Sequence, residues 1–243
     1  MSNPILNEKN FNEQARVYEG AFMTVNGTIQ VAVFLALILV CTATFVWSRY
    51  SSGYMDIATM LTGGGLIVGI ILGFIIAFTR NKYLVPIYAA AEGCFIGGTS
   101  AIFESQYPGI VVQAVAGTFA ALFMMLVLYK IGLIRATEKF RSVIFITTAS
   151  IAVVYLVDII GRLFLHLHVP VINSASPLGI LVSIGITAIA ALNLIIDFDF
   201  VEQGERMMLP KDYEWIGAFG LMVTLVWLYL EILRLLAKLN SRR

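Results

Sequence analysis

The sequence contains little cysteine and little charge. Only two of its 243 residues are cysteines, Cys41 and Cys94, and both lie in apolar stretches, so we expect buried thiols rather than a disulfide framework. Charged residues make up 13% of the chain, whereas a typical soluble domain has about 25%. The chain also has no long basic run, which argues against nucleic-acid binding. These shortages point away from soluble and secreted classes of protein.

Several signatures of catalysis and ligand binding are absent as well. There is no Gly-x-Ser-x-Gly motif, which removes one common sign of a serine hydrolase. The glycine run at 63–65 lacks the Lys-Ser or Lys-Thr of a phosphate-binding loop, so we assign it to close packing or flexibility of a helix. His166 and His168 stand without further histidine or cysteine nearby, which is a weak metal signal. The first 27 residues are polar and acidic, unlike a cleavable signal sequence.

Long apolar runs dominate the rest of the chain. Hydrophobic residues make up 59% of it, and a helix that spans a membrane needs about 20 mostly apolar residues. Seven runs qualify: 28–48, 57–79, 83–104, 109–131, 142–165, 176–198 and 216–238. Ser176 and Pro177 suit the N-cap and first turn of the sixth helix. We therefore predict an all-α integral membrane bundle of seven transmembrane helices over residues 28–240, after a cytoplasmic N-terminal tail of residues 1–27.

The orientation follows from lysine and arginine. The tail and the joints on its side carry ten of these residues, whereas the opposite joints carry only Arg49 and Arg162 before the last helix. Because positively charged joints stay in the cytoplasm, we expect a cytoplasmic N-terminus. Seven crossings then place the C-terminus outside, where four basic residues from 234 onward run against the rule. Either the last helix is an exception or it does not cross fully, and we favour seven crossings.

Ionisable side chains within the apolar runs are the candidate functional residues. A charge at the centre of a spanning helix costs about 2.5–3.5 kcal/mol on the insertion scale, so such residues usually face the bundle interior and often mark function. Glu231 lies deep in the seventh run, and Arg234, three residues on, could pair with it. The full set is Glu92, Asp158, Asp197, Glu231 and Arg234, with Asn193 on the face of Asp197, Asp199 just beyond, and Arg80 at the end of the second run.

Structural interpretations exist beside the functional ones. Asp199 fits a solvated helix end, and Arg80 fits a positive anchor that reaches the lipid headgroups. Glu92 stands among small residues, where it fits a buried clamp as well as a pathway residue. Asp158 and Arg162 are four residues apart and predict an ion pair that is structural.

Two acidic stretches resemble the paired acidic signatures of the Bax-inhibitor family, also called the transmembrane Bax inhibitor motif family. They are LNLIIDFDFVEQ at 192–203 and WLYLEILRLL at 227–236. The stretch AFTRNKYLVPIYAAAEGCFIGG at 77–98 is similar to the family's junction between helices two and three. EGAFMTVNGT at 19–28 fits a bacterial subgroup, and the helix spacing agrees over residues 28–240.

The resemblance implies a pH-sensitive calcium leak in a bacterial inner membrane. It implies that Asp197 and Glu231 form a carboxyl pair on helices six and seven that gates the leak and binds calcium, and that Arg80 latches the closed state. This chain has Glu231 where better-known members have aspartate. Counted from Gly217 along a straight helix, Glu231 lies about 20 Å deep, whereas Asp197 looks shallow. Their pairing therefore requires a seventh helix that begins in the cytosol, or a kinked or tilted sixth helix.

The chemistry of such a pair suits the implied gate. Two carboxylates about 4 Å apart repel by roughly 4 kcal/mol at an effective dielectric of 20. They would then titrate as a unit, and their ionised oxygens are ligands that Ca²⁺ prefers. The apolar runs thus predict contact with the bilayer, and the resemblance implies contact with calcium ions and protons; we expect neither a cofactor nor catalysis.

Two rival functions use the same acids. An intramembrane aspartyl protease also places two acids on neighbouring helices, but its Gly-x-Gly-Asp stretch has no counterpart here. A non-conducting scaffold that regulates a membrane partner would use the acids only to hold the bundle together. Cleavage of a peptide substrate would favour the first rival, and partner binding that survives amide replacements would favour the second.

Overall fold

The computed structural model describes residues 22–161 and 174–242, and in these residues the long elements are helices. A short 3₁₀ helix, η1 (Lys82–Leu84), joins the second long helix to the third. The long helices are α2 (Val25–Ser51), α3 (Met55–Thr79), α4 (Val85–Gln106), α5 (Ile110–Lys130), α6 (Glu138–Ile160), α8 (Pro177–Arg206) and α9 (Tyr213–Asn240). The all-α class is therefore confirmed.

The predicted spans are largely confirmed. Six of the seven long helices, all except α4, are long and apolar enough to cross a membrane. The predicted N-cap is present, because the Ser176 side chain accepts a hydrogen bond from the Gly179 backbone N–H at 3.0 Å. Most boundaries differ from prediction by a few residues, and two of the differences have a clear cause. α2 begins at Val25, inside the predicted tail, because Thr24 caps it. α8 continues past residue 198 to Arg206, because side chains pair along its last turns.

α4 differs from the other long helices because it packs through small residues. A methyl group added at Gly97 would lie 2.3 Å from the Ala43 carbonyl oxygen of α2. One added at Gly65 of α3 would lie 2.5 Å from the Ala91 carbonyl oxygen of α4. Of the run at 63–65, only Gly65 makes such a contact. α4 is thus enclosed between α2 and α3 by close backbone approach, which small residues allow.

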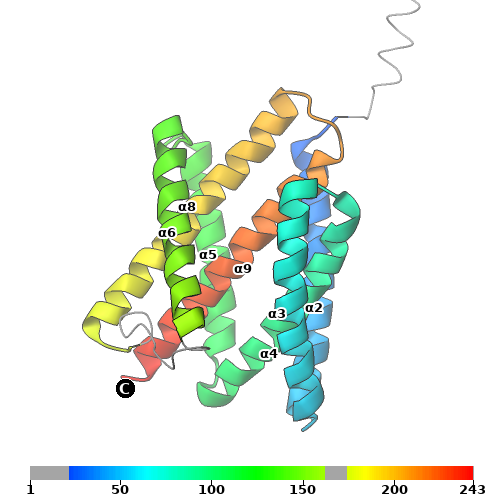
Figure 1. Cartoon of the computed structure of the whole chain (residues 1–243). Coiled ribbons are helices and arrows are strands. Elements are labelled where there is room, and N and C mark those ends of the chain that lie inside the picture. Colours follow the sequence, from blue (N-terminus) through cyan, green and yellow to red (C-terminus); the bar gives the residue numbers. More distant parts are fainter. Residues whose placement is uncertain (1–21, 162–173, 243) are drawn as a thin grey trace, which may run out of the picture.

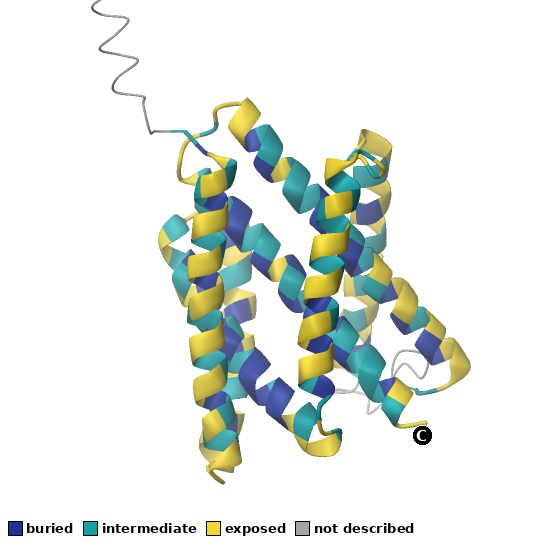
Figure 2. Cartoon of the chain, turned by 180° about the vertical axis from the view of Figure 1, so that it is seen from behind, coloured by how far each residue is buried: buried dark blue, intermediate teal, exposed yellow. Residues whose placement is uncertain are grey.

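Three helices form one packed group, and an oblique pair links the other two helices to it (Figure 1). The group is α2, α3 and α4; α5 touches it through α4 alone, and α6 does not touch it. α8 and α9 pack on each other and cross the bundle at a slant; α9 contacts α2, α4 and α5. Buried residues follow the inner faces of the helices, while the outer faces are exposed, as an environment of lipid requires (Figure 2).

The start of α2 is fastened to the joint between α8 and α9. The buried carboxylate of Glu214 accepts hydrogen bonds from the backbone N–H and the hydroxyl of Thr24, at 3.1 and 3.0 Å. Glu205 accepts one from the Val25 backbone N–H at 3.0 Å. Carboxylates at a helix N-terminus satisfy its free N–H groups and suit its dipole. Three helix ends are therefore held together on the side of the bundle opposite to the C-terminus.

Candidate functional site

α6 is attached to the bundle mainly through polar side chains. Among the described helices, its backbone approaches that of α8 alone. Three α6 residues spaced by seven, Arg141, Thr148 and Tyr155, share one face, and each makes a polar contact to the α8–α9 pair. Most of the remaining α6 side chains are exposed or half-buried. We call these three contacts the α6 anchors.

The first two anchors join α6 to α8. Arg141 forms an ion pair with Asp199. Asp199 also accepts hydrogen bonds from the Gln203 side chain at 2.9 Å and from the Tyr129 hydroxyl at 3.4 Å. The Asn193 amide donates to the Thr148 hydroxyl at 3.0 Å. Asp199 is therefore a partnered group at a helix junction, and its interpretation as a solvated helix end is wrong.

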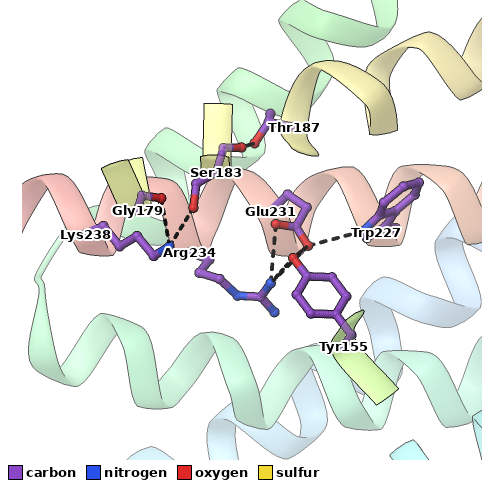
Figure 3. A network of polar contacts seen from close by, with 8 residues as sticks. All are labelled: Tyr155, Gly179, Ser183, Thr187, Trp227, Glu231, Arg234 and Lys238. Carbon is purple, nitrogen blue, oxygen red and sulfur yellow. Dashed lines mark hydrogen bonds and ion pairs between the residues drawn. The ribbon is translucent and has the colours of Figure 1, made fainter. Parts of the chain in front are cut away.

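The third anchor joins Tyr155 to Glu231, the best-buried charged side chain among the described residues (Figure 3). Glu231 is 1% exposed. Its Oε1 accepts hydrogen bonds from the Tyr155 hydroxyl at 2.8 Å, from Trp227 Nε1 at 3.2 Å and from Arg234 Nη1 at 3.0 Å. The Arg234 guanidinium also lies over the Tyr155 ring, 4.9 Å from its centroid. The ion pair that the sequence spacing allowed is present, and Tyr155 extends it to α6.

Polar groups continue toward the C-terminal end of α9. Lys238, one turn beyond Arg234, is buried and donates to the Ser183 hydroxyl at 2.6 Å and to the Gly179 carbonyl at 3.2 Å. Figure 3 shows Lys238, Arg234, Glu231 and Trp227 along one side of α9. We call the set of polar side chains between α6, α8 and α9 the polar seam. It comprises Arg141, Thr148, Tyr155, Ser183, Asn193, Asp197, Asp199, Thr224, Glu231, Arg234 and Lys238.

Asp197 lies in this seam at a different level from Glu231. Its carboxylate is close to Thr224 and to Gly220 of α9, where an added methyl group would lie 3.5 Å from Oδ1. Thr224 precedes Glu231 by seven residues, or about 10 Å along the helix. The structure therefore does not form the predicted carboxyl pair, because α8 and α9 cross with Asp197 against the first half of α9. Oδ2 of Asp197 is enclosed and has no hydrogen-bond partner among the described residues.

Arg80 is not placed as a latch on either acid. It ends α3 with a left-handed backbone (φ 53°), and its Nη1 donates to the Tyr213 hydroxyl at 2.8 Å. The side chain lies over the Tyr213 ring near the start of α9. The cation that holds a seam carboxylate deep in the bundle is Arg234. The predicted latch of Arg80 on Asp197 is therefore absent from this conformation, because Arg80 is drawn to the surface end of α9.

Two further candidates lie elsewhere in the structure. Glu92 on α4 faces Gly69 of α3, where an added methyl group would lie 3.0 Å from its Oε1, so it belongs to the α3–α4 contact and not to the seam. Asp158 is buried near the end of α6. Its predicted partner Arg162 lies outside the described residues, as do His166 and His168.

The donor set for a metal ion is sparse. The described residues contain no group of three or more histidine, cysteine, aspartate or glutamate side chains that could hold one. Asp197 and Glu231 are separated along the seam, so neither adds a ligand to the other in this conformation. The seam offers single carboxylates at successive levels rather than a cage.

The sequence pattern does not point directly to the α6 side of the site. Thr148 and Tyr155 are neutral, so a search for buried charge passes over them. Their spacing from Arg141, at seven and fourteen residues, was the available signal, because it places all three on one face of an apolar helix. Lys238 is one of the four basic residues from 234 onward that the sequence uses only to judge orientation, yet it makes two hydrogen bonds inside the bundle.

Comparison with known proteins now adds a relationship to this geometry. The model of one family, described as Bax inhibitor 1 like, matches residues 3–241, which is nearly the whole chain. A search of curated protein sequences finds no match to the chain.

Proposed function

The chain belongs to the Bax inhibitor 1 like family of membrane proteins, and on this basis we propose that it is a pH-sensitive calcium leak of a bacterial inner membrane. The observation that carries the proposal is the polar seam, which runs through an otherwise apolar bundle. The ion would pass between α6 and the α8–α9 pair, and the α6 anchors would form the gate. This differs from the gate implied by the family resemblance, because the two acids act at separate levels.

The extent of the seam supports a pathway. From Thr224 to Lys238, its α9 members are fourteen residues apart, or about 21 Å along the helix. The hydrocarbon core is about 30 Å thick, so even with the slant of α9 the polar groups reach deep into it. Ionisable residues inside spanning helices are costly and typically line ion or proton routes.

The packing of α6 supports a gate at its anchors. Ile144 is the only apolar side chain of α6 that is buried in the described part of the chain, so the Tyr155–Glu231–Arg234 cluster contributes much of the attachment of α6 to α9. Protonation of Glu231 would remove the charge that Arg234 binds, and the cluster would weaken. α6 would then separate from α9, and we expect calcium flux to rise on acidification.

The carboxylates suit calcium in passage. Ca²⁺ takes carboxylate and carbonyl oxygens as ligands, and conduction requires sites that bind weakly enough to release the ion. Asp197 has an enclosed oxygen without a hydrogen-bond partner in the described part of the chain. It is therefore the better candidate for a transient calcium site, whereas Glu231, held by three donors, is the better candidate for the gate.

Calcium flux into dye-loaded liposomes at about pH 5 to 8 tests this division of roles. Glu231→Gln keeps the shape of the side chain but carries no charge, so we expect high flux that no longer depends on pH. Asp197→Asn should lower flux at every pH and keep the pH dependence. Glu92→Gln is the matched control, since Glu92 is a membrane-embedded acid outside the seam, and it should behave as the native chain.

The rival scaffold function rests on one observation, the complete pairing of Glu231 by Tyr155, Trp227 and Arg234. A purely structural acid would look the same. Native protein that is folded in liposomes and gives no flux above empty vesicles at any pH would refute the leak and favour the scaffold. A pH-dependent flux that Glu231→Gln leaves unchanged would keep the leak and move the gate elsewhere.

A further inference from the structure

An elongated apolar groove lies on the opposite side of α9 from Glu231. It has a volume of about 390 Å³. One wall is the face of α2 from Ala32 to Trp47, and the other is α5 from Val111 to Phe119. α4 and α9 form the floor, which includes Ser100 and Tyr229. No member of the polar seam lines the groove, so its role is independent of the proposed leak.

The groove opens sideways toward the bilayer. α2 and α5 make no backbone contact with each other, so nothing in the described helices closes the space between them. Their neighbouring side chains face outward, with Leu37 at 60% and Val112 at 73% exposed. Both helices are long and apolar enough to cross a membrane. The mouth of the groove is therefore continuous with the surface that contacts lipid.

The buried polar side chains of the groove, Ser100, Thr118 and Tyr229, are already hydrogen-bonded within the protein. The hydroxyls of Ser100 and Tyr229 are hydrogen-bonded to each other at 2.6 Å, and both residues are buried. The Thr118 hydroxyl donates to the Ala114 carbonyl at 2.8 Å. A water molecule needs two to four polar partners to stay in such a site, and an apolar cavity that lacks them stays dry. An empty groove would lose the dispersion contacts of its whole lining. The groove therefore suits an apolar occupant.

The shape of the groove favours a chain over a compact ligand. The α2 wall runs for sixteen residues, whose first and last lie about 22 Å apart along the helix. This exceeds half of the roughly 30 Å hydrocarbon core, so an occupant would lie along the membrane normal past its midplane. The α5 wall covers only the end near Trp47, so the groove is most enclosed there. An indole at a helix end is suited to the headgroup level of a bilayer.

We propose that the groove between α2 and α5 binds one acyl chain of a membrane phospholipid, with the headgroup at the Trp47 end. The chain enters sideways from the bilayer and packs on the floor formed by α4 and α9. The occupant fills the space between α2 and α5, which make no backbone contact with each other.

The test measures how much phospholipid the protein retains and which residues the acyl chain contacts. The full chain is exchanged extensively into lipid-free detergent, and the phospholipid that remains is counted by phosphorus assay and mass spectrometry. Ala36→Phe fills the groove, because Ala36 lines it, whereas the neighbouring Leu37→Phe adds similar bulk on the outer surface. The native chain and Leu37→Phe should retain one phospholipid per chain, and Ala36→Phe should lose it.

A second measurement uses the native chain, because Ala36→Phe could lose lipid simply by misfolding. Phosphatidylcholine with a photoreactive group along its acyl chain should label groove residues such as Val115 and Met222 in preference to Leu37. Labelling confined to outer residues, with no retained lipid, would overturn the proposal. Crosslinks between two copies through α2 and α5, with no lipid retained, would also overturn it and identify a second chain as the occupant.

Discussion

Removal of Arg234 should destabilise the protein more than neutralisation of its partner Glu231. Arg234→Met leaves Glu231, which is 1% exposed, without its cation. Glu231→Gln leaves Arg234, whose side chain is 37% exposed and can turn toward water or headgroups. The glutamine carbonyl also still accepts from Tyr155 and Trp227. The two variants break the same ion pair but leave different groups behind.

The structure sets the size of the difference. Removing one partner of a buried pair costs about 3–5 kcal/mol, and the partial exposure of Arg234 argues for the lower end. Loss of a hydrogen bond to a charged group, with the acceptor retained, costs about 1.5 kcal/mol. We therefore expect a gap of about 1.5 kcal/mol between the variants. The double variant should cost less than their sum, because it leaves no unpaired charge.

Unfolding in detergent, followed by helical circular dichroism, measures these free energies. The control is Arg206→Met, because the pair of Arg206 and Glu202 has side chains 72% and 39% exposed, and such pairs contribute at most about 1 kcal/mol. Equal costs for Arg234→Met and Glu231→Gln, with an additive double variant, would show that the buried pair is not coupled as the structure places it.

Three further predictions follow from the helix contacts. Gly97→Ala should unfold or destabilise the protein by more than about 2 kcal/mol, because the added methyl would lie 2.3 Å from a carbonyl oxygen of α2; Gly64→Ala, with nothing within 4 Å, should be neutral or slightly stabilising in the same unfolding assay. Glu214→Ala should speed hydrogen exchange of the first turn of α2 selectively, because that turn loses its cap; uniform protection across α2 would contradict the clamp. The hydrogen bond to Asp212 raises the pKa of Lys82. The Lys82–Asp212 contact therefore stabilises the folded state fully below the usual pKa of lysine, and this stabilisation is lost as pH rises through the raised pKa. Lys82→Met should remove this alkaline loss from the pH dependence of the free energy of unfolding.

The sequence was sufficient where the physics is local. The apolar runs predicted the helices, and Ser176 predicted the start of α8. The spacing of Glu231 and Arg234 predicted an ion pair within one helix. Each of these depends on residues within one or two turns. The same holds for the buried position of Glu231, because a long apolar stretch on both sides leaves no boundary for it.

The sequence was insufficient where two helices had to be placed against each other. Asp197 and Glu231 look like a pair only until the crossing of α8 and α9 is known, and a helix axis that slants moves a contact by several residues. Asp199 looked solvated because its partner Arg141 is on another helix. The family resemblance implied that Arg80 is a latch, and the sequence could not correct this because the backbone turn of Arg80 and its contact with Tyr213 depend on the joint that follows α3.

α4 also bears on how the protein enters the membrane. A segment that is less apolar than its neighbours, and that carries Glu92 near its middle, gains little by leaving the translocation channel alone. α4 is instead stabilised by packing on α2 and α3, both of which are synthesised before it. We expect α4 to leave the translocation channel only after it has packed on these two helices, so that the three helices enter the bilayer as one unit. The order of the chain then supplies a protein-lined place for a helix that lipid alone would accept poorly.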